Sequence, residues 1–429
     1  MRRHLRSSIV ITMALALVAA LDLMGAPAAL AATVNVGPGQ SIQAAINAAS
    51  PGDTIVVAPG TYRENIEIHK NNITLQGTPG GTVLAPPGAA KAAHNACFVS
   101  ATNFDGICLA SVSGVTVSGF TVRGFPGIGI HSFNSDHLRI DNNRLNNNGL
   151  DGIADYVGSQ NFITNNQASG SSEAGILAAN SIKGGINIIG NTTTNNGAGI
   201  YMRDDAEDRN APFDPNALVG NYVINNDSEG NCVGILALDT PAAPDVMSVS
   251  IGGAGVGDEQ GAGNRVIANN KTCPPTQYLP VTTSGSGILA LGTTANPASL
   301  DPGAYGVWAA SQDSFTIRFN TVRDNVPSDI RLPYAGGIVL GTYPGSLPLT
   351  GSNICCNTAY GDQPFDIRYI PGANGRALRP NTFPYGIGSG VIIVLNNCDT
   401  SSPKNAPIFT ATGIAYVPIC RPEPAPTGF

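Results

Sequence analysis

One short pattern of apolar and polar positions recurs along the middle of the chain. An aliphatic residue is followed three positions later by Asn, in the pairs Ile140/Asn143, Ile163/Asn166, Ile188/Asn191, Leu218/Asn221 and Ile317/Asn320. A Gly-Ile pair also recurs, beginning at Gly129, Gly152, Gly175, Gly199, Gly234, Gly287 and Gly337. The first three spacings between these Gly-Ile pairs are 23, 23 and 24 residues. A period of this length indicates stacked supersecondary units.

The apolar pieces of the repeat are short and rich in Ile and Val, with turn residues on both sides, which is typical of strands rather than helices. Equivalent strands of successive coils would stack at the ordinary strand spacing of ~4.8 Å. The Ile residues then form an aliphatic ladder inside, and the repeated Asn forms a hydrogen-bonded ladder at one corner. We therefore predict an all-β solenoid, a single-stranded parallel β-helix.

The segment Ser41–Ala49 is expected to form a helix, because Ile42, Ala45, Ile46 and Ala49 lie on one helical face. Such a helix would cap the open end of the stack. Together with Pro51–Val57 and Pro59–Tyr62, this segment and the repeats resemble the pectate-lyase-like superfamily over roughly residues 33 to 400. The resemblance implies a right-handed parallel β-helix with an N-terminal capping helix.

Residues 1–31 are predicted to be a signal peptide, with a basic start, an apolar stretch and the small residues Ala29 and Ala31 at the cleavage positions. We expect a β-helix domain over residues 32–400 and a C-terminal segment, 401–429, packed through Cys420. No later apolar run approaches the ~18 residues of a membrane-spanning helix. The product is therefore predicted to be a secreted monomer without a membrane span, released to the periplasm or the medium.

Eight cysteines agree with an oxidising destination. Cys97 and Cys108 are close enough to clip one loop, and Cys232 and Cys273 flank one long excursion. The remaining four are expected to tie down the C-terminal end: Cys355, Cys356, Cys398 and Cys420. Eight cysteines allow 105 connectivities, so the pairing stays open. Disulfides are favoured over a metal site because the chain has no CxxC pair and no obvious His partner.

The net charge of −7 argues against a nucleic-acid partner, which needs clustered Lys and Arg. An acidic polysaccharide would need bridging cations or a local basic patch.

If the Ile of each Gly-Ile pair points inward, the next residue points outward. This outward column reads His131, Ala154, Leu177, Tyr201, Leu236, Leu289 and Val339; two positions further are Phe133, Tyr156, Ala179, Arg203, Leu238 and Leu291. A surface stripe this apolar is either covered by other parts of the chain or used to bind a ligand. Insertions at residues 206–217, 239–249, 271–284, 292–304 and 341–352 are expected to cover its later part. An open sugar-binding groove is predicted at His131, Phe133, Tyr156 and Tyr201.

Ionisable groups are densest at residues 203–209, where a strand ends. Arg203, Asp204 and Asp205, together with Asp155, are the candidate catalytic residues for hydrolysis of a glycosidic bond, with Asp151 and Asp239 on nearby coils. A Ca²⁺ site at Asp204, Asp205 and Asp208 is the alternative, and the resemblance to pectate-type lyases would then make an Arg the base. A solvated acidic loop is the third interpretation. Asp155 falls in an inward column and is expected to reach solvent at a bent strand end; burial would raise its pKa.

The resemblance does not extend to a well-marked catalytic subfamily. Asp204-Asp205 resembles the double Asp of polygalacturonase-type hydrolases, but the Gly-His-Gly and Arg-Ile-Lys motifs expected downstream are missing.

Three functions stay open: a polysaccharide hydrolase or lyase, a non-catalytic β-helix that binds polysaccharide or another surface partner, and a NosD-like accessory protein that handles copper. The last is least favoured, because a soft-metal site needs clustered sulfur or imidazole. The sequence favours a polysaccharide-directed role.

Overall fold

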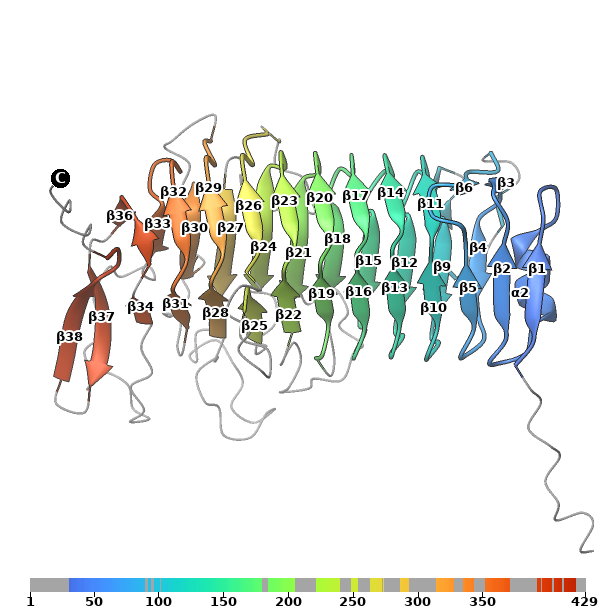
Figure 1. Ribbon diagram of the computed structural model, residues 1–429, viewed down its shortest axis with the longest axis horizontal. Helices are drawn as coiled ribbons and strands as arrows, with labels where there is room; N and C mark the ends of the chain where they lie inside the picture. Colours follow the sequence, from blue (N-terminus) through green and yellow to red (C-terminus); the bar gives the residue numbers. More distant parts are fainter. Residues whose placement is uncertain are drawn as a thin grey trace, which may run out of the picture.

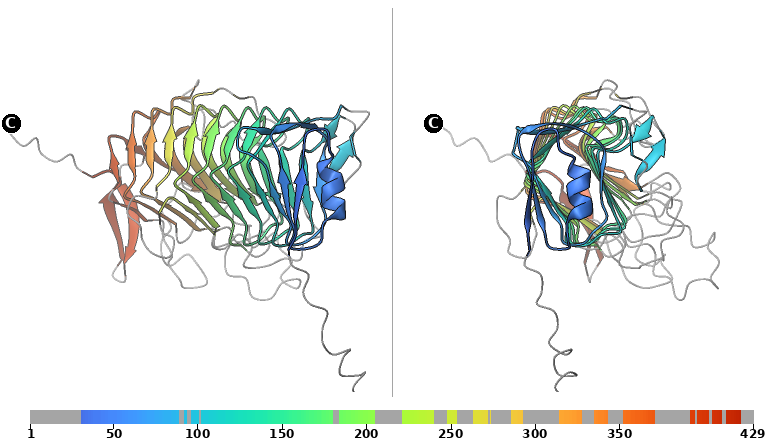
Figure 2. Two further views of the ribbon diagram at one scale, coloured as in Figure 1. Left: turned by 45° about the vertical axis from the view of Figure 1, so that its right-hand side comes forward. Right: turned by 90° about the vertical axis from the view of Figure 1, so that its right-hand side faces the viewer.

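The computed structural model describes residues 31–88, 92–93, 96–100, 102–179, 184–204, 221–239, 248–253, 263–271, 273, 286–292, 314–327, 335–342, 352–370, 392–394, 396–402, 405–410 and 413–421. The predicted signal peptide lies outside the described residues, except for its last residue. Three long parallel sheets run side by side along the molecule, and the chain visits each sheet once per coil (Figures 1 and 2). This arrangement is a right-handed parallel β-helix, as the repeat and the resemblance together predict.

We name the sheets A, B and C, and each stacks its strands from the N-terminal end of the coil to the C-terminal end. Sheet A holds β1 (Thr33–Val36), β2 (Thr54–Val57), β5 (Thr74–Gln76), β10 (Thr116–Ser118), β13 (Arg139–Asp141), β16 (Phe162–Thr164), β19 (Asn187–Ile189), β22 (Asn221–Ile224), β25 (Ser248–Ile251), β28 (Ser314–Arg318), β31 (Asn353–Cys355) and β34 (Ile392–Val394). Sheet B holds β3 (Gly60–Arg63), β6 (Thr82–Ala85), β11 (Phe120–Arg123), β14 (Arg144–Asn146), β17 (Gln167–Ser169), β20 (Thr192–Thr194), β23 (Asp227–Glu229), β26 (Arg265–Ile267), β29 (Thr321–Arg323), β32 (Thr358–Tyr360) and β35 (Asn397–Cys398). Sheet C holds β4 (Ile66–Ile68), β9 (Ile107–Ala110), β12 (Ile130–Phe133), β15 (Ile153–Tyr156), β18 (Ala174–Ala179), β21 (Ala198–Asp204), β24 (Val233–Asp239), β27 (Ser286–Gly292), β30 (Gly336–Thr342), β33 (Ile367–Ile370) and β36 (Ser401–Ser402).

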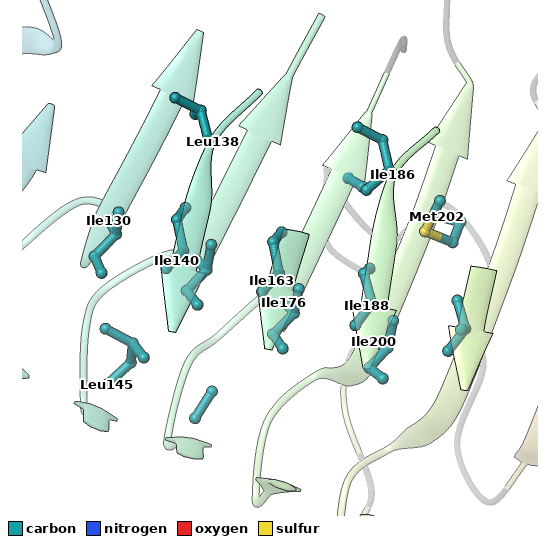
Figure 3. Close-up of a cluster of buried hydrophobic side chains, with 14 of the residues drawn as sticks. Ile130, Leu138, Ile140, Leu145, Ile163, Ile176, Ile186, Ile188, Ile200 and Met202 are labelled. Atoms are coloured by element: carbon teal, nitrogen blue, oxygen red, sulfur yellow. The ribbon is translucent and has the colours of Figure 1, made fainter. Parts of the chain in front are cut away.

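The Ile residues of the Gly-Ile pairs form the predicted ladder inside the coil. Ile130, Ile153, Ile176 and Ile200 are register partners on consecutive strands and are fully buried (Figure 3). The Gly before each Ile is required by close packing between coils. A Cβ on Gly152 would lie 2.5 Å from the backbone oxygen of Gly175 in the next coil. The recurring Gly-Ile pair therefore reflects one structural need, a backbone crossing with no room for a side chain.

The Asn ladder joins sheet A to sheet B and runs through eight coils. Asn191 illustrates its geometry: its backbone N–H and its Nδ2 both donate to Oδ1 of Asn226, at 2.8 and 3.0 Å. Its Nδ2 also donates to the backbone oxygen of Ile163 in the preceding coil. The ladder members are Asn143, Asn166, Asn191, Asn226, Asn264, Asn320, Asn357 and Asn396. These bonds satisfy amides that are buried away from water.

One predicted member of this ladder is wrong. Asn221 opens β22 and accepts from the backbone N–H of Ile186, at a different corner of the coil. Asn226, three residues after Val223, holds the ladder position instead. The same aliphatic-to-Asn spacing occurs twice within nine residues there, and the pattern by itself does not say which Asn faces the corner.

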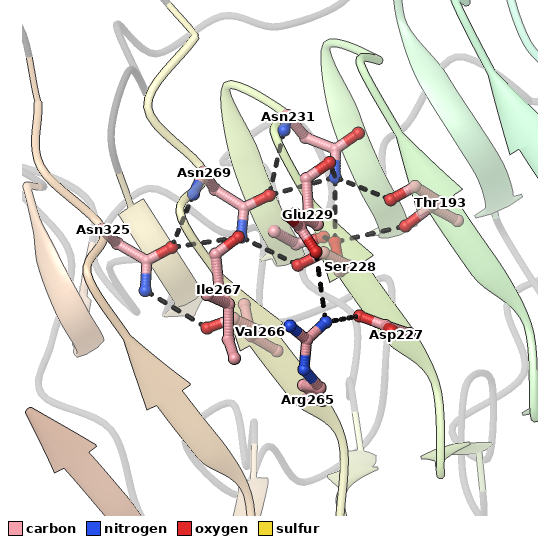
Figure 4. Close-up of polar contacts among 11 residues, drawn as sticks. Thr193, Asp227, Ser228, Glu229, Asn231, Arg265, Val266, Ile267, Asn269 and Asn325 are labelled. Atoms are coloured by element: carbon pink, nitrogen blue, oxygen red, sulfur yellow. Dashed lines mark hydrogen bonds and ion pairs between the residues drawn. The ribbon is translucent and has the colours of Figure 1, made fainter.

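A second polar ladder joins sheet B to sheet C. Asn196, Asn231, Asn269 and Asn325 each donate from the backbone N–H and Nδ2 to the next member (Figure 4). Its last acceptor is a carboxylate, Asp362, whose Oδ1 receives both bonds from Asn325. The other oxygen of Asp362 is buried and has no hydrogen-bond partner among the described residues. A charge at this position is therefore poorly compensated.

The helix α2 (Ile42–Ala48) closes the N-terminal end of the coil (Figure 2). Ile42, Ala45, Ile46 and Ala49 are buried, as their spacing predicts. Glu64 accepts hydrogen bonds from the hydroxyl of Ser41 and the backbone N–H of Ile42, which satisfies donors at the start of the helix. None of the described helices is long and apolar enough to cross a membrane.

The C-terminal end carries an antiparallel hairpin, β37 (Asn405–Thr410) and β38 (Gly413–Pro418), followed by Ile419, which is buried in the core. A disulfide joins Cys398 to Cys420 there. The structure also joins Cys232 to Cys273, and Cys355 to its neighbour Cys356. The expectation that all four of the last cysteines tie down the C-terminal end is therefore wrong for Cys355 and Cys356, which bond to each other.

Burial raises the pKa of Asp362 to about 7, with repulsion from Asp366 and Asp324 acting in the same direction. A carboxyl group with a raised folded pKa keeps its proton in the folded protein, whereas the unfolded chain releases it near its ordinary value of 3.8. The free energy of unfolding therefore falls as pH rises from about 4 to 7. We predict that Asp362→Asn, which continues the ladder without a charge, raises the free energy of unfolding at pH 8 by up to roughly 4 kcal/mol.

Denaturant unfolding of both proteins from pH 4 to pH 8 measures this effect, and the two curves should converge at the acid end. Asp399→Asn is the matched control, because it removes an exposed carboxylate that is not among the charges acting on Asp362. Parallel pH profiles for the Asp362 variant and the wild type would contradict the prediction.

Candidate functional site

The outer face of sheet C is the surface on which the predicted site residues gather. His131 on β12 lies between Cys108 on β9 and Ala154 on β15 in the parallel register. Phe133 and Tyr156 form the neighbouring outward column on the same strands. The strand alternation that buries Ile130 and Ile153 thus presents these side chains on the outside.

The later part of the outward stripe is covered. Ala154, Leu177, Tyr201, Leu236, Leu289 and Val339 are fully buried and belong to a second hydrophobic cluster, separate from the core inside the coil. The insertions expected to supply this cover lie largely outside the described residues. Tyr201 is predicted from the sequence to bind sugar, but its side chain is 0% exposed. That prediction is wrong for the structure described, because this column packs into the second cluster and does not line an open groove.

The stripe opens at the coils of β12 and β15. The Phe133 side chain is 44% exposed, and Tyr156 beside it is partly exposed. The His131 ring packs edge-on against Tyr156, with ring centroids 5.4 Å apart. Three flat side chains therefore border one another on an exposed surface, and we call this set the aromatic platform: His131, Phe133 and Tyr156.

Asp105 fixes the orientation of His131. Its Oδ2 lies 2.6 Å from Nδ1 of His131, and its Oδ1 accepts from the backbone N–H of Ile128 at 2.6 Å. Because an ionised carboxylate only accepts, Nδ1 carries the hydrogen, and in the neutral form of the ring Nε2 carries the lone pair. Nε2 is enclosed and has no hydrogen-bond partner in the part of the chain that the structure describes.

A buried ionic group lies next to the platform. Nη1 of Arg203 on β21 is 3.1 Å from Oε1 of Glu173, and both side chains are almost completely buried. The guanidinium also lies over the rings of Tyr156 and Tyr201, 5.7 and 5.8 Å from their centroids. The sequence predicts a catalytic Arg203, yet the side chain is enclosed by these partners and does not face an open surface.

Asp151 adds a second carboxyl to this group. Its Oδ1 accepts from the backbone N–H of Ala174, and the whole residue is buried. Burial raises the pKa of Asp151 well above its ordinary value, and the charge of Glu173 raises it further. The arrangement therefore favours the protonated form of Asp151 more than an exposed carboxyl would, and it places Arg203 where it neutralises Glu173.

Asp155 lies inside the coil. Its two carboxylate oxygens accept from Oγ of Ser132 at 2.8 Å and from Nδ2 of Asn161 at 2.8 Å, and the residue is 2% exposed. The expectation that a bent strand end exposes Asp155 to solvent is wrong. The side chains of β15 alternate between inward and outward up to its last residue, Tyr156, so Asp155 points inward. Burial raises the pKa of Asp155 to about 6. A carboxyl enclosed in the core has no access to a polysaccharide, so its predicted catalytic role is not supported.

The acidic run that follows β21 is described only in part. Asp204 ends β21 and is the register partner of Asp239, which ends β24. The side chains of these two residues lie outside the described part of the structure, as do Asp205 and Asp208 in full. The predicted catalytic pair and the predicted Ca²⁺ site at Asp204, Asp205 and Asp208 therefore stay predictions.

A hairpin brings Cys97 and Asp105 to the same place. Strands β7 (Phe98–Ser100) and β8 (Asn103–Phe104) pair antiparallel, with Phe98 opposite Phe104, and stand outside the coil (Figure 2). Cys97 precedes this hairpin and Asp105 follows it, so both lie at its base. Cys97 forms a disulfide with Cys108, the neighbour of His131 in the outward column.

Sequence reasoning missed Asp105 and Glu173. A signal for Asp105 was available, because Gly106-Ile107 stands 23 residues before Gly129-Ile130 and adds one coil to the repeat. Asp105 then occupies the same position before Gly-Ile as Asp151 does. Glu173 had no comparable signal, since its importance depends on the reach of Arg203 across the face of the sheet.

The fold and the repeats define the chain as a right-handed parallel β-helix protein. A family model described as "Periplasmic copper-binding protein (NosD)" matches residues 46–240, which is less than half of the chain. This match includes the hairpin, the aromatic platform and the buried ionic group. No curated protein matches the sequence significantly.

The solved structures that are similar to this chain share little sequence with it. The A-module of the mannuronan C-5 epimerase AlgE6 of Azotobacter vinelandii is 16% identical, with a TM-score of 0.44 over 83% of this chain and 94% of the epimerase module. The catalytic domain of a GH87 α-1,3-glucanase is 13% identical, with a TM-score of 0.45 over 87% of this chain and 70% of the glucanase domain. Pectate lyase Pel9A is 12% identical, with a TM-score of 0.37 over 86% of this chain and 78% of the lyase. These likenesses concern the fold.

The buried ion pair gives a test of the site's electrostatics. We predict that Arg203→Met lowers the free energy of unfolding by about 3–5 kcal/mol at pH 7, because the buried Glu173 loses the counter-charge of Arg203. The loss should shrink in acid, where the carboxyl is protonated. Denaturant unfolding at pH 7 and pH 4 measures both effects.

The matched control is Arg265→Met. Arg265 also bonds two carboxylates, Asp227 at 2.6 Å and Glu229 at 3.2 Å, but all three side chains are exposed. Exposed pairs of this kind contribute about 0–1 kcal/mol. Equal losses for the two Arg variants would show that burial is not what makes the Arg203 pair important.

Proposed function

We propose that the protein binds polysaccharide outside the cytoplasm, on the outer face of sheet C, and that the aromatic platform is the place where the sugar stacks. The observation that carries this proposal is the exposure of Phe133 beside Tyr156 and His131 on consecutive coils, where the other members of the stripe whose side chains the structure describes are buried. Flat side chains on a rigid sheet present the apolar surface on which sugar rings stack. The disulfides agree with an oxidising compartment.

The charges near the platform favour a neutral or weakly charged polysaccharide. Arg203 is occupied by Glu173, and His131 is held by Asp105. The described residues around the platform therefore offer no unoccupied cation for the carboxylates of a uronic-acid chain. The net charge of −7 acts in the same direction, because it repels a polyanion.

The first experiment measures binding. We expect the protein to bind at least one member of a panel of neutral and acidic polysaccharides in isothermal titration or affinity electrophoresis. Phe133→Ala should weaken that binding about tenfold or more, the loss expected when one stacking aromatic ring is removed.

Phe162→Ala is the matched control, because Phe162 is equally exposed, at 45%, but lies on β16 in sheet A. Its binding should equal that of the wild type. Equal losses for the two variants, or an unchanged affinity for Phe133→Ala, would contradict the proposed platform.

Cleavage of the bound polysaccharide is the second candidate function, and the register of Asp204 and Asp239 favours it. Register partners on neighbouring parallel strands lie ~4.8 Å apart. Carboxylates carried at that spacing suit a retaining glycoside hydrolase, in which one acts as nucleophile and the other as acid. This candidate needs an open surface at the ends of β21 and β24.

A product screen tests cleavage. Each polysaccharide is incubated with the protein, with and without Ca²⁺, and new reducing ends and the ultraviolet absorbance of unsaturated uronic acids are followed. Hydrolysis predicts reducing ends without absorbance, and their loss by at least roughly 100-fold in Asp204→Asn and Asp239→Asn. Ca²⁺-dependent absorbance would identify a lyase instead. A polysaccharide that binds and yields no product would limit the function to binding.

A further inference from the structure

Three potential metal ligands converge at the base of the β7–β8 hairpin. One ligand atom each from Cys97, Asp105 and His131 lies within 4.8 Å of the other two. Cys108 belongs to the same place, because it is bonded to Cys97 and is the register partner of His131. These residues come from the two ends of the hairpin and from β9 and β12, which are neighbouring strands of sheet C.

His131 is prepared to act as a ligand. Asp105 holds Nδ1 at 2.6 Å, and the second oxygen of Asp105 is fixed by the backbone N–H of Ile128. Nε2, with its lone pair, is the buried atom that has no hydrogen-bond partner among the described residues. A carboxylate that binds one ring nitrogen of a His is the usual partner of a metal-ligating imidazole, because it fixes the tautomer and the ring orientation.

We propose that Cys97, Cys108 and His131 bind one thiophilic cation, Zn²⁺ or Cu⁺, when the Cys97–Cys108 disulfide is reduced, and that Asp105 orients the imidazole. Two thiolates and one imidazole form a donor set that suits these cations. A fourth position stays open for water or another ligand. The cation site does not depend on polysaccharide binding.

The geometry requires movements of side chains and no change in the register of the strands. In a tetrahedral site with Zn–S near 2.3 Å and Zn–N near 2.0 Å, the donor atoms lie roughly 3.5–3.8 Å apart. One ring nitrogen of His131 and the sulfur of Cys97 lie within 4.8 Å of each other, and the Cα atoms of the two cysteines are 5.7 Å apart. Separation of the sulfur atoms after reduction, and rotation of their side chains, would supply the required spacing.

The disulfide and the metal site are alternative states of the same two cysteines. An external dithiol supplies two electrons and two protons to the S–S bond and becomes a disulfide itself, which leaves two thiols on the protein. Metal binding then displaces the two thiol protons into solvent. Reoxidation of the thiolates to the disulfide, by an oxidant that accepts two electrons, would release the cation.

The test uses the protein prepared with reduced cysteines and kept under anaerobic conditions. Co²⁺ serves as the spectroscopic probe, and Zn²⁺ and Cu⁺ affinities are measured by competition with chromogenic chelators. We expect one equivalent of Co²⁺ to give thiolate charge-transfer absorption in the reduced protein and none in the oxidised protein. His131→Ala should weaken binding and change the visible bands, and Asp105→Asn should weaken it about 10- to 100-fold.

Two controls separate this site from the other cysteines and from surface histidines. His137→Ala removes a histidine whose Nδ1 is also near a carboxylate, 3.2 Å from Asp136, but which is exposed and not a register partner of a cysteine. Cys398→Ser/Cys420→Ser removes a different disulfide. Both should bind Co²⁺ as the wild type does, whereas Cys97→Ser/Cys108→Ser should lose the charge-transfer band.

The proposal is overturned if the charge-transfer band persists in the Cys97/Cys108 double variant, or if His131→Ala and His137→Ala behave alike. It is also overturned if the reduced protein loses its β-sheet circular dichroism, because the site requires the folded coil. His131→Ala keeps the disulfide and so reports on the histidine even where the double cysteine variant is unstable. The absorption readout is independent of polysaccharide affinity, so the failure of one proposal leaves the other intact.

Discussion

The fold depends on stacking at the spacing of neighbouring strands, with the buried corners of each coil satisfied by side-chain amides. Backbone bonds within the three sheets hold the strands in register, but the corners leave backbone groups unpaired. Asn191 resolves this at one corner, since its amide binds the coils before and after it. Because an unpaired buried polar group costs about 1–3 kcal/mol, each corner must be filled in every coil. This requirement is why the same residue type returns at one position while the outer residues vary.

The inward half of the structure was readable from the sequence, because every coil repeats it. Ile130, Ile153 and Ile176 are spaced by the period, and the capping helix shows its apolar face in Ile42 and Ile46. The outer half was less readable. Tyr201 and Arg203 have outward positions in the alternation, yet they are buried by a second layer of packing that has no period. Asp155 has an inward position in the alternation but was expected to reach solvent at the end of its strand. It is buried, because the alternation continues to the end of β15.

The polar groups on sheet C show how one face can carry two kinds of site. Arg203 and Glu173 form an ion pair in the covered part, where low polarity strengthens their attraction and protects it from salt. Asp105 and His131 form a hydrogen-bonded pair at the rim, where Phe133 on the same strand as His131 is exposed. The two pairs differ in how far other side chains cover them. Arg203 on β21 is buried, whereas Phe133 beside His131 on β12 is exposed. Long-range contacts of this kind are invisible to spacing, because Glu173 and Arg203 are 30 residues apart.

The Asn ladder also has a direction. Each member donates from its backbone N–H and its Nδ2 to the Oδ1 of the Asn in the following coil. These two donors of every coil are therefore satisfied only when the next coil is present. The series ends at Asn396, whose Nδ2 donates to the backbone oxygens of Ile354 and Ile419. Whole coils gained or lost in the middle of the stack would leave the same set of bonds at both ends. Length is therefore free to vary by complete turns during evolution, whereas the terminating segment around Ile419 is not interchangeable with a coil.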